Sequence, residues 1–140
     1  MALQLLFQQD VNRQPKRPLM ERFVHDRLND AVAEPFCLSL FDGVMSHQKE
    51  IDLKLTAAAD NWRLHRMSAV DRNVLRLGVY EMVYMPEPTP GPVALDEAIE
   101  LSRRYGSKDS PAFVNGVLDK LYQLKIAQDK KSKLASAEAS

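Results

Sequence analysis

Cysteine is almost absent from the chain: Cys37 is the single one among 140 residues. This excludes an internal disulfide framework and is typical of proteins in a reducing compartment. The sequence also lacks any apolar run near the roughly 20 residues that a membrane-spanning helix needs. Its first residues do not show the basic region and apolar run of a signal peptide. We therefore expect a cytoplasmic protein that makes no use of a membrane.

An excess of charge of either sign is missing as well, because 19 Lys and Arg residues balance 19 Asp and Glu residues. Proteins that bind nucleic acid indiscriminately usually carry a basic excess. A nucleic-acid site on this chain must therefore be a local patch. The length, with 45% hydrophobic and 27% charged residues, fits one domain with a real core.

Residue patterns that mark catalytic or metal sites are missing too. His25, His47 and His65 lie far apart, and with a single cysteine there is no metal-ligand spacing. No nucleophile elbow, phosphate loop or zinc-protease motif occurs. The acids of "LDEAIE" stand near the start of an expected helix, where the helix dipole favours negative charge. The sequence predicts a binding protein without cofactor, not an enzyme.

Apolar residues recur at helical spacing, and no segment alternates convincingly with a period of two. We expect an all-α bundle of six or seven helices, and a break near Ser46 is left open. The expected helices span about 2–11, 19–33, 35–46, 51–62, 69–85, 94–105 and 111–127. From about Gln128 the apolar period is lost, which predicts a domain at 1–127 and a disordered tail at 128–140.

Two glycines lie inside the most strongly periodic segments. Gly78 and Gly116 each cost about 1 kcal/mol relative to alanine in a helix interior. Close packing against another helix is the favoured explanation for both. Close approach of a ligand or of a partner's backbone is the alternative.

Three segments, "RMSAVDRNVLRLGVYEM", "VALDEAIELSRRYG" and "DSPAFVNGVLDKL", resemble the NusB family of transcription antitermination factors. "ALQLLFQQD" and "FCLSLFDGV" are similar to the first and third helices of that family, and Trp62 stands where the family often has tryptophan. These elements follow in the family's order over nearly the whole chain. The resemblance implies two packed three-helix subdomains without catalytic activity.

The resemblance also implies partners. Family members bind a small-subunit ribosomal protein called NusE and a short single-stranded box A sequence in ribosomal RNA leaders, and the complex helps RNA polymerase read through terminators. Some members form homodimers. Two alternatives stay open: a helical protein–protein module that has lost RNA binding, and an accessory domain of an RNA cytosine methyltransferase system.

Positions in the sequence can be matched to the family's functional residues. The resemblance implies that Asp109 and Phe113 lie at the RNA surface with Lys108 as their basic neighbour. It implies that Phe7, in place of a common tyrosine, and Asp71, in place of a longer glutamate, face the protein partner. Simpler roles are a core position for Phe113, and helix-start positions for Asp71 and Asp109.

Basic residues are the remaining candidates for RNA contacts. In the family, an arginine-rich turn that contributes to the RNA surface usually precedes the residues matching Ala2 to Phe7, and this sequence starts after it. We therefore expect weak RNA binding by the chain alone. The local basic candidates are Arg13, Lys16, Arg17, Arg72, Arg76, Arg103 and Arg104.

Overall fold

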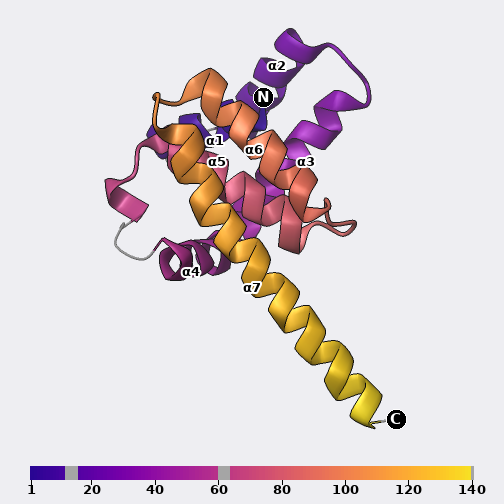
Figure 1. The fold of residues 1–140 in the computed structure, drawn as a ribbon. Coiled ribbons are helices and arrows are strands. Elements are labelled where there is room, and N and C mark those ends of the chain that lie inside the picture. Colours follow the sequence, from indigo (N-terminus) through magenta and orange to yellow (C-terminus); the bar gives the residue numbers. More distant parts are fainter. Residues whose placement is uncertain (12–15, 60–63, 140) are drawn as a thin grey trace.

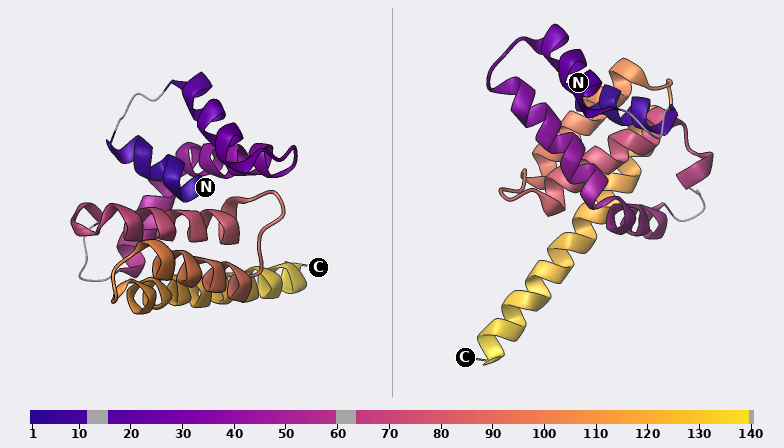
Figure 2. Two further views of the ribbon diagram at one scale, coloured as in Figure 1. Left: turned by 90° about the horizontal axis from the view of Figure 1, so that it is seen from above. Right: turned by 180° about the vertical axis from the view of Figure 1, so that it is seen from behind.

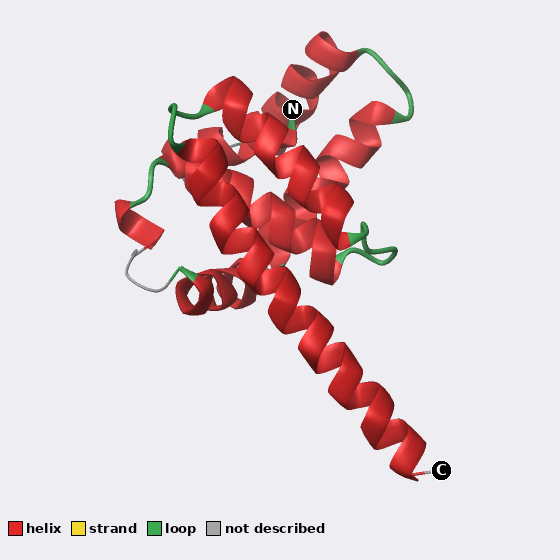
Figure 3. Cartoon of the chain, viewed as in Figure 1, coloured by secondary structure: helices red, strands yellow, loops and turns green. Residues whose placement is uncertain are grey.

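A computed structural model describes residues 1–11, 16–59 and 64–139, and this part of the chain consists of helices and turns (Figure 1, Figure 3). The all-α prediction is confirmed. Arg13 and Trp62 lie outside the described residues. The elements are α1 (Ala2–Val11), α2 (Arg17–Leu28), α3 (Ala33–Ser46), α4 (Gln48–Ala58), the 3-10 turn η1 (Leu64–Arg66), α5 (Ala69–Val79), the π-helical turn η2 (Tyr80–Tyr84), α6 (Gly91–Tyr105) and α7 (Ser110–Ala139).

Helix α5 lies at the centre of the molecule between two groups of helices (Figure 2). Helices α1 and α3 pack against one side of it, and α6 and α7 pack against the other. Every residue from Asn73 to Val79 is buried, as in a helix surrounded by protein. The expected division into two packed groups is present, and α4 joins the group of α5, α6 and α7.

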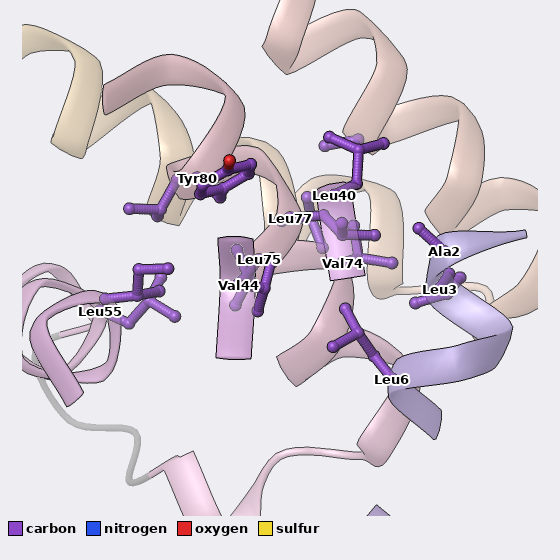
Figure 4. Packing of buried hydrophobic residues seen from close by; sticks show 14 of the residues in the cluster. Ala2, Leu3, Leu6, Leu40, Val44, Leu55, Val74, Leu75, Leu77 and Tyr80 are labelled. Atoms are coloured by element: carbon purple, nitrogen blue, oxygen red, sulfur yellow. The ribbon is translucent and has the colours of Figure 1, made fainter. Parts of the chain in front are cut away.

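The core forms where α1, α3 and α5 meet (Figure 4). Leu3 and Leu6 from α1 lie close to Leu40 from α3 and to Val74 and Leu77 from α5. Burying a leucine or valine side chain stabilises the fold by about 1.5–3 kcal/mol. This packing fixes α1 against α5, and so it sets the positions of the side chains at the ends of both helices.

The turn between α2 and α3 corrects the predicted helix end. The sequence predicts a helix to about Ala33, but α2 ends at Leu28. Asn29 takes the left-handed conformation, with φ of 44°, which Asn tolerates better than most residues. The Asp30 carboxylate then accepts hydrogen bonds from the backbone N–H groups of Val32 and Ala33, both at 2.8 Å. These bonds lower the pKa of Asp30 and start α3 in a new direction.

The two interior glycines have different surroundings. A Cβ atom on Gly78 would lie 2.7 Å from Cδ1 of Leu118 on α7, so close helix packing accounts for this glycine. A Cβ atom on Gly116 would meet no atom within 4 Å. Packing within the chain therefore does not account for Gly116, and the prediction of close packing is wrong for that position.

Helix α7 continues past the expected end of the ordered domain. The sequence predicts a disordered tail from Gln128, but the helix runs to Ala139 and extends away from the other helices (Figure 1). Residues 131–137 are exposed, which agrees with the loss of the apolar period. The segment holds neither Gly nor Pro and is rich in Lys and Ala, so a helix already started continues at little cost. The domain boundary at 127 stays a prediction.

In the described part of the chain, no helix is long and apolar enough to span a membrane.

Candidate functional site

A pocket lies between the start of α5 and the start of α7. Its volume is about 280 Å³. Three of the predicted site residues, Asp71, Asp109 and Phe113, take part in its lining although they come from two segments far apart in sequence. The lining residues are Arg66, Met67, Ser68, Asp71, Ser107, Asp109, Ser110 and Phe113. The structure thus brings predicted partner-binding and RNA-binding residues into one site.

Serine hydroxyl groups accept backbone hydrogen bonds on both sides of the pocket. On the α5 side, Ser68 is the N-cap, and its hydroxyl accepts a hydrogen bond from the backbone N–H of Asp71 at 3.1 Å. On the α7 side, the buried Ser110 hydroxyl accepts from the backbone N–H of Ser107 at 2.9 Å. That bond closes the turn before α7. The pocket is therefore built on two short, hydrogen-bonded helix starts.

Asp71 carries an unsatisfied acceptor in this site. Its Oδ1 atom is buried and, among the described residues, has no hydrogen-bond partner. A buried acceptor without a partner costs about 1–3 kcal/mol. The helix cap does not use this oxygen, because the cap bond joins the backbone N–H of Asp71 to the Ser68 hydroxyl.

Two predicted RNA-binding arginines form ion pairs within the fold. Arg76 is 7% exposed, and its guanidinium donates to both carboxylate oxygens of Asp52, at 2.9 and 3.0 Å. Arg72 donates to Asp10 at 3.0 Å and to the backbone carbonyl of Leu64 at 3.2 Å. Basic side chains seldom lie in protein interiors unless they are paired, and both of these are. Burial argues against the prediction for Arg76. Arg72 is partly exposed, and its place at the RNA surface stays a prediction.

Asp10 is the carboxylate that joins α1 to α5. It accepts hydrogen bonds from Asn73 at 2.7 Å and from Arg72, and it lies 3.6 Å from Arg76. Burial acts to raise the pKa of Asp10, but the bonds from Asn73 and Arg72 outweigh it, so the pKa lies below its ordinary value. We name the polar group of Asp10, Asp52, Arg72, Asn73 and Arg76 the α1–α5 network.

The remaining predicted site residues lie outside the pocket lining. Phe7 is 44% exposed on α1, one turn before Asp10. The α1–α5 network places that end of α1 beside the first turn of α5, where Asp71 lies. Lys108 is exposed in the turn between two lining residues. Arg104 is exposed on α6 and lies 3.5 Å from Glu100, as does Arg103.

Sequence reasoning missed Arg66, Ser107 and the role of Ser110 in the turn. Arg66 lies in η1, before the Ser68 cap. It is the first residue of the segment "RMSAVDRNVLRLGVYEM", but neither the resemblance nor the apolar period gave it a role. The serines occupy turns, where serine is common for local reasons alone. Only the approach of the α5 and α7 starts in space assigns these residues to one site.

Two glutamates form a second polar feature, away from the pocket. Glu81 of η2 and Glu97 of α6 line a small cavity of about 130 Å³. Burial and the hydrogen bond with Glu97 raise the pKa of Glu81 to about 8. Groups of three or more His, Cys, Asp or Glu residues placed to bind a metal ion do not occur in the described part of the chain.

The raised pKa of Glu81 predicts that stability falls as pH rises. Between about pH 5 and pH 8 the folded state keeps a proton that the unfolded chain, with a pKa near 4.5, has lost. This corresponds to at most about 1.4 kcal/mol per pH unit, and we expect about half because the side chain stays partly solvated. Urea unfolding at pH 5, 6.5 and 8 should show this slope for the unmodified protein and a flatter one for Glu81→Gln. Glu87→Gln, at an exposed position, is the control and should keep the full slope.

Comparison with known proteins agrees with the fold and the motifs. The sequence model of the NusB family matches residues 1–123. The transcription antitermination protein NusB of Solibacter usitatus (strain Ellin6076) is 44% identical over 120 residues, which cover 84% of this chain and 81% of that protein.

Solved structures give the same result. A NusB structure from T. maritima has a TM-score of 0.75 at 34% identity, covering 87% of this chain and 85% of that chain. A crystal structure of the antitermination factors NusB and NusE in complex with dsRNA has a TM-score of 0.75 at 26% identity, covering 88% and 91%. The chain belongs to the NusB family.

Proposed function

We propose that this protein is a transcription antitermination factor without enzymatic activity, which binds the ribosomal protein NusE and box A-type single-stranded RNA in ribosomal RNA leaders. It acts within the antitermination complex of RNA polymerase, in the cytoplasm. The observation that carries the proposal is the pocket between α5 and α7, because it joins Asp71 to Asp109 and Phe113. The family membership and the neighbouring NusB–NusE complex support the choice of partners.

The proposed mechanism is a composite surface. Asp71 offers an unsatisfied carboxylate oxygen to a basic side chain of NusE. Asp109 and Phe113 offer an acceptor and an aromatic ring to the RNA, and single-stranded RNA is commonly recognised by stacking together with hydrogen bonds to base edges. Since Asp71 lines the same pocket as Asp109 and Phe113, NusE and RNA would lie side by side. Each would strengthen the binding of the other, so neither needs high affinity alone.

The direct test is a titration of labelled box A-like RNA with this protein, alone and with NusE. We expect weak binding by the protein alone, because its net charge is zero, and tighter, sequence-selective binding with NusE present. A scrambled strand and a duplex of the same sequence are the controls. Equal affinity for the box A-like and scrambled strands contradicts the proposal. Binding of NusE without selective RNA binding would favour the alternative protein–protein module.

Removing the aromatic ring of Phe113 should weaken RNA binding by the complex. Stacking of one base on an aromatic side chain contributes about 1–3 kcal/mol, so Phe113→Ala should raise the Kd for RNA about 5- to 150-fold. Phe113→Tyr keeps the ring and should bind nearly as well. The matched control is Phe23→Ala, because Phe23 is also half-buried against the core but lies on α2. A similar loss in both alanine variants would mean that the effect comes from the fold and not from stacking.

A further inference from the structure

The pocket between α5 and α7 includes a basic residue to which no role is yet assigned. Arg66 lines it together with Asp109 and Phe113. Arg66 is exposed, so its guanidinium can reach a ligand at the mouth of the pocket. Arg66 comes from η1, whereas Asp109 and Phe113 come from the turn before α7 and from α7 itself. The pocket therefore has a cation on one wall and an aromatic ring on another.

Arg66 differs from the other arginines proposed for RNA contact in its pairing. Those arginines that lie in the described part of the chain have carboxylate partners: Arg17 with Asp42, Arg72 with Asp10, Arg76 with Asp52, and Arg103 and Arg104 with Glu100. Within that same part of the chain, no carboxylate lies within ion-pair distance of Arg66. A phosphate would therefore not have to displace an existing partner from Arg66.

The size and chemistry of the pocket fit a single nucleotide. Its volume of about 280 Å³ is just below the roughly 300–1,000 Å³ of small-molecule pockets. Phe113 supplies a surface for one base, and Asp109 supplies an acceptor. Both Asp71 and Asp109 are negative, however, and would repel an RNA phosphate. A cation in the same pocket is needed to offset them, and Arg66 is placed to do so.

We propose that Arg66 binds the phosphate of the nucleotide whose base lies against Phe113. This inference rests on the proposed function, since it names a further residue of the same RNA site. Arginine suits the role because its planar guanidinium can donate two parallel hydrogen bonds to one phosphate. Lys108, exposed in the turn beside Asp109, supplies a second positive charge near the same strand.

The test compares Arg66→Ala with Arg22→Ala in the complex with NusE. Arg22 is an exposed arginine on α2, so it controls for the loss of one positive charge. We expect Arg66→Ala to raise the Kd for box A-like RNA about tenfold, as for loss of a charge-assisted hydrogen bond. The slope of log affinity against log salt should become shallower by about 0.7, which is the value for one phosphate contact on a single strand. Arg66→Lys keeps the charge and should restore the slope but only part of the affinity.

The outcomes separate this inference from the proposed function. In the first outcome, the unmodified complex binds RNA selectively, and both Arg66→Ala and Arg22→Ala keep the affinity and the salt slope of the unmodified complex. The assignment of Arg66 is then overturned, and the proposed function stands. If Arg66→Ala weakens NusE binding without RNA and leaves the salt slope unchanged, Arg66 contacts an acidic group of the protein partner instead. If the unmodified complex shows no selective RNA binding, both the proposed function and the assignment fail.

Discussion

Replacing Arg76 by alanine is expected to lower the free energy of unfolding by about 3 kcal/mol, which is a large fraction of the 5–15 kcal/mol typical of a domain. Arg76 is almost completely buried and forms paired hydrogen bonds with Asp52. It also donates to the side-chain oxygen of the fully buried Asn73 at 3.1 Å and lies 3.6 Å from Asp10. Removing it would leave the partly buried Asp52 without its cation and Asp10 with Arg72 as its only basic partner among the described residues.

The expected loss is large because of what remains after the substitution. An intact buried ion pair contributes little, since the cost of removing both charges from water offsets their attraction. Removal of one member is costly, because the other charge stays buried and unpaired. The α1–α5 network has both carboxylates on elements other than α5, Asp10 on α1 and Asp52 on α4. Loss of Arg76 therefore weakens two helix contacts of the central helix at once.

Urea unfolding at pH 7 measures this effect, with Arg103→Ala as the matched control. Arg103 also lies near a glutamate, but on the surface, where an ion pair contributes about 0–1 kcal/mol. Arg76→Lys keeps the charge but not the planar pair of donors, and should fall between the two. If Arg76→Ala and Arg103→Ala lose similar stability, the network is not a determinant of the fold.

Most of the fold could be predicted from the sequence because helices follow a local pattern. The spacing of apolar residues predicted α1 and the buried face of α7, and Gly106 predicted the end of α6. The errors fall where local chemistry competes with the period. Asn29 and Asp30 end one helix and start the next within an expected helix. Beyond Gln128, helix propensity alone continues α7 after its apolar contacts end.

The candidate site was only partly predictable, for a different reason. Asp71, Asp109 and Phe113 belong to motifs that resemble the family, so each could be named from its own segment. Arg76 was a candidate for RNA contact because it is basic, and the sequence does not reveal that Asp52 on α4 pairs with it. Arg66 begins one of these motifs, but the resemblance gave it no role. Pairing and pocket lining depend on contacts between elements, which periodicity within one element cannot give.

Reversing the charge of Asp71 is expected to weaken the complex with NusE about 30- to 4,000-fold. Truncating one side of a buried charge pair at an interface costs about 2–5 kcal/mol, and a like charge placed there adds repulsion. The buried Oδ1 atom of Asp71 already lacks a donor in the free protein, so a basic group of the partner would gain a bond without breaking one. Asp71→Lys removes this acceptor and places a cation against the expected basic side chain.

The effect on the fold should be small, which makes the prediction specific. The hydrogen bond from the backbone N–H of residue 71 to the Ser68 hydroxyl does not require the carboxylate. Loss of an acid from the first turn of α5 costs about 0.3–1 kcal/mol through the helix dipole. The melting temperature of Asp71→Lys should therefore stay within a few degrees of the unmodified protein.

Titration calorimetry with NusE, in the absence of RNA, checks the prediction, with two further variants of Asp71. Asp71→Asn keeps the size and an acceptor oxygen but loses the charge, and should weaken binding less than Asp71→Lys. Asp71→Glu tests whether a longer acid reaches the partner's basic group better, and we expect it to bind NusE at least as tightly. Unchanged affinity in Asp71→Lys would remove Asp71 from the partner interface. It would also leave the pocket as a site for RNA alone, in which case NusE would have to bind elsewhere, for example at the exposed Phe7 on α1.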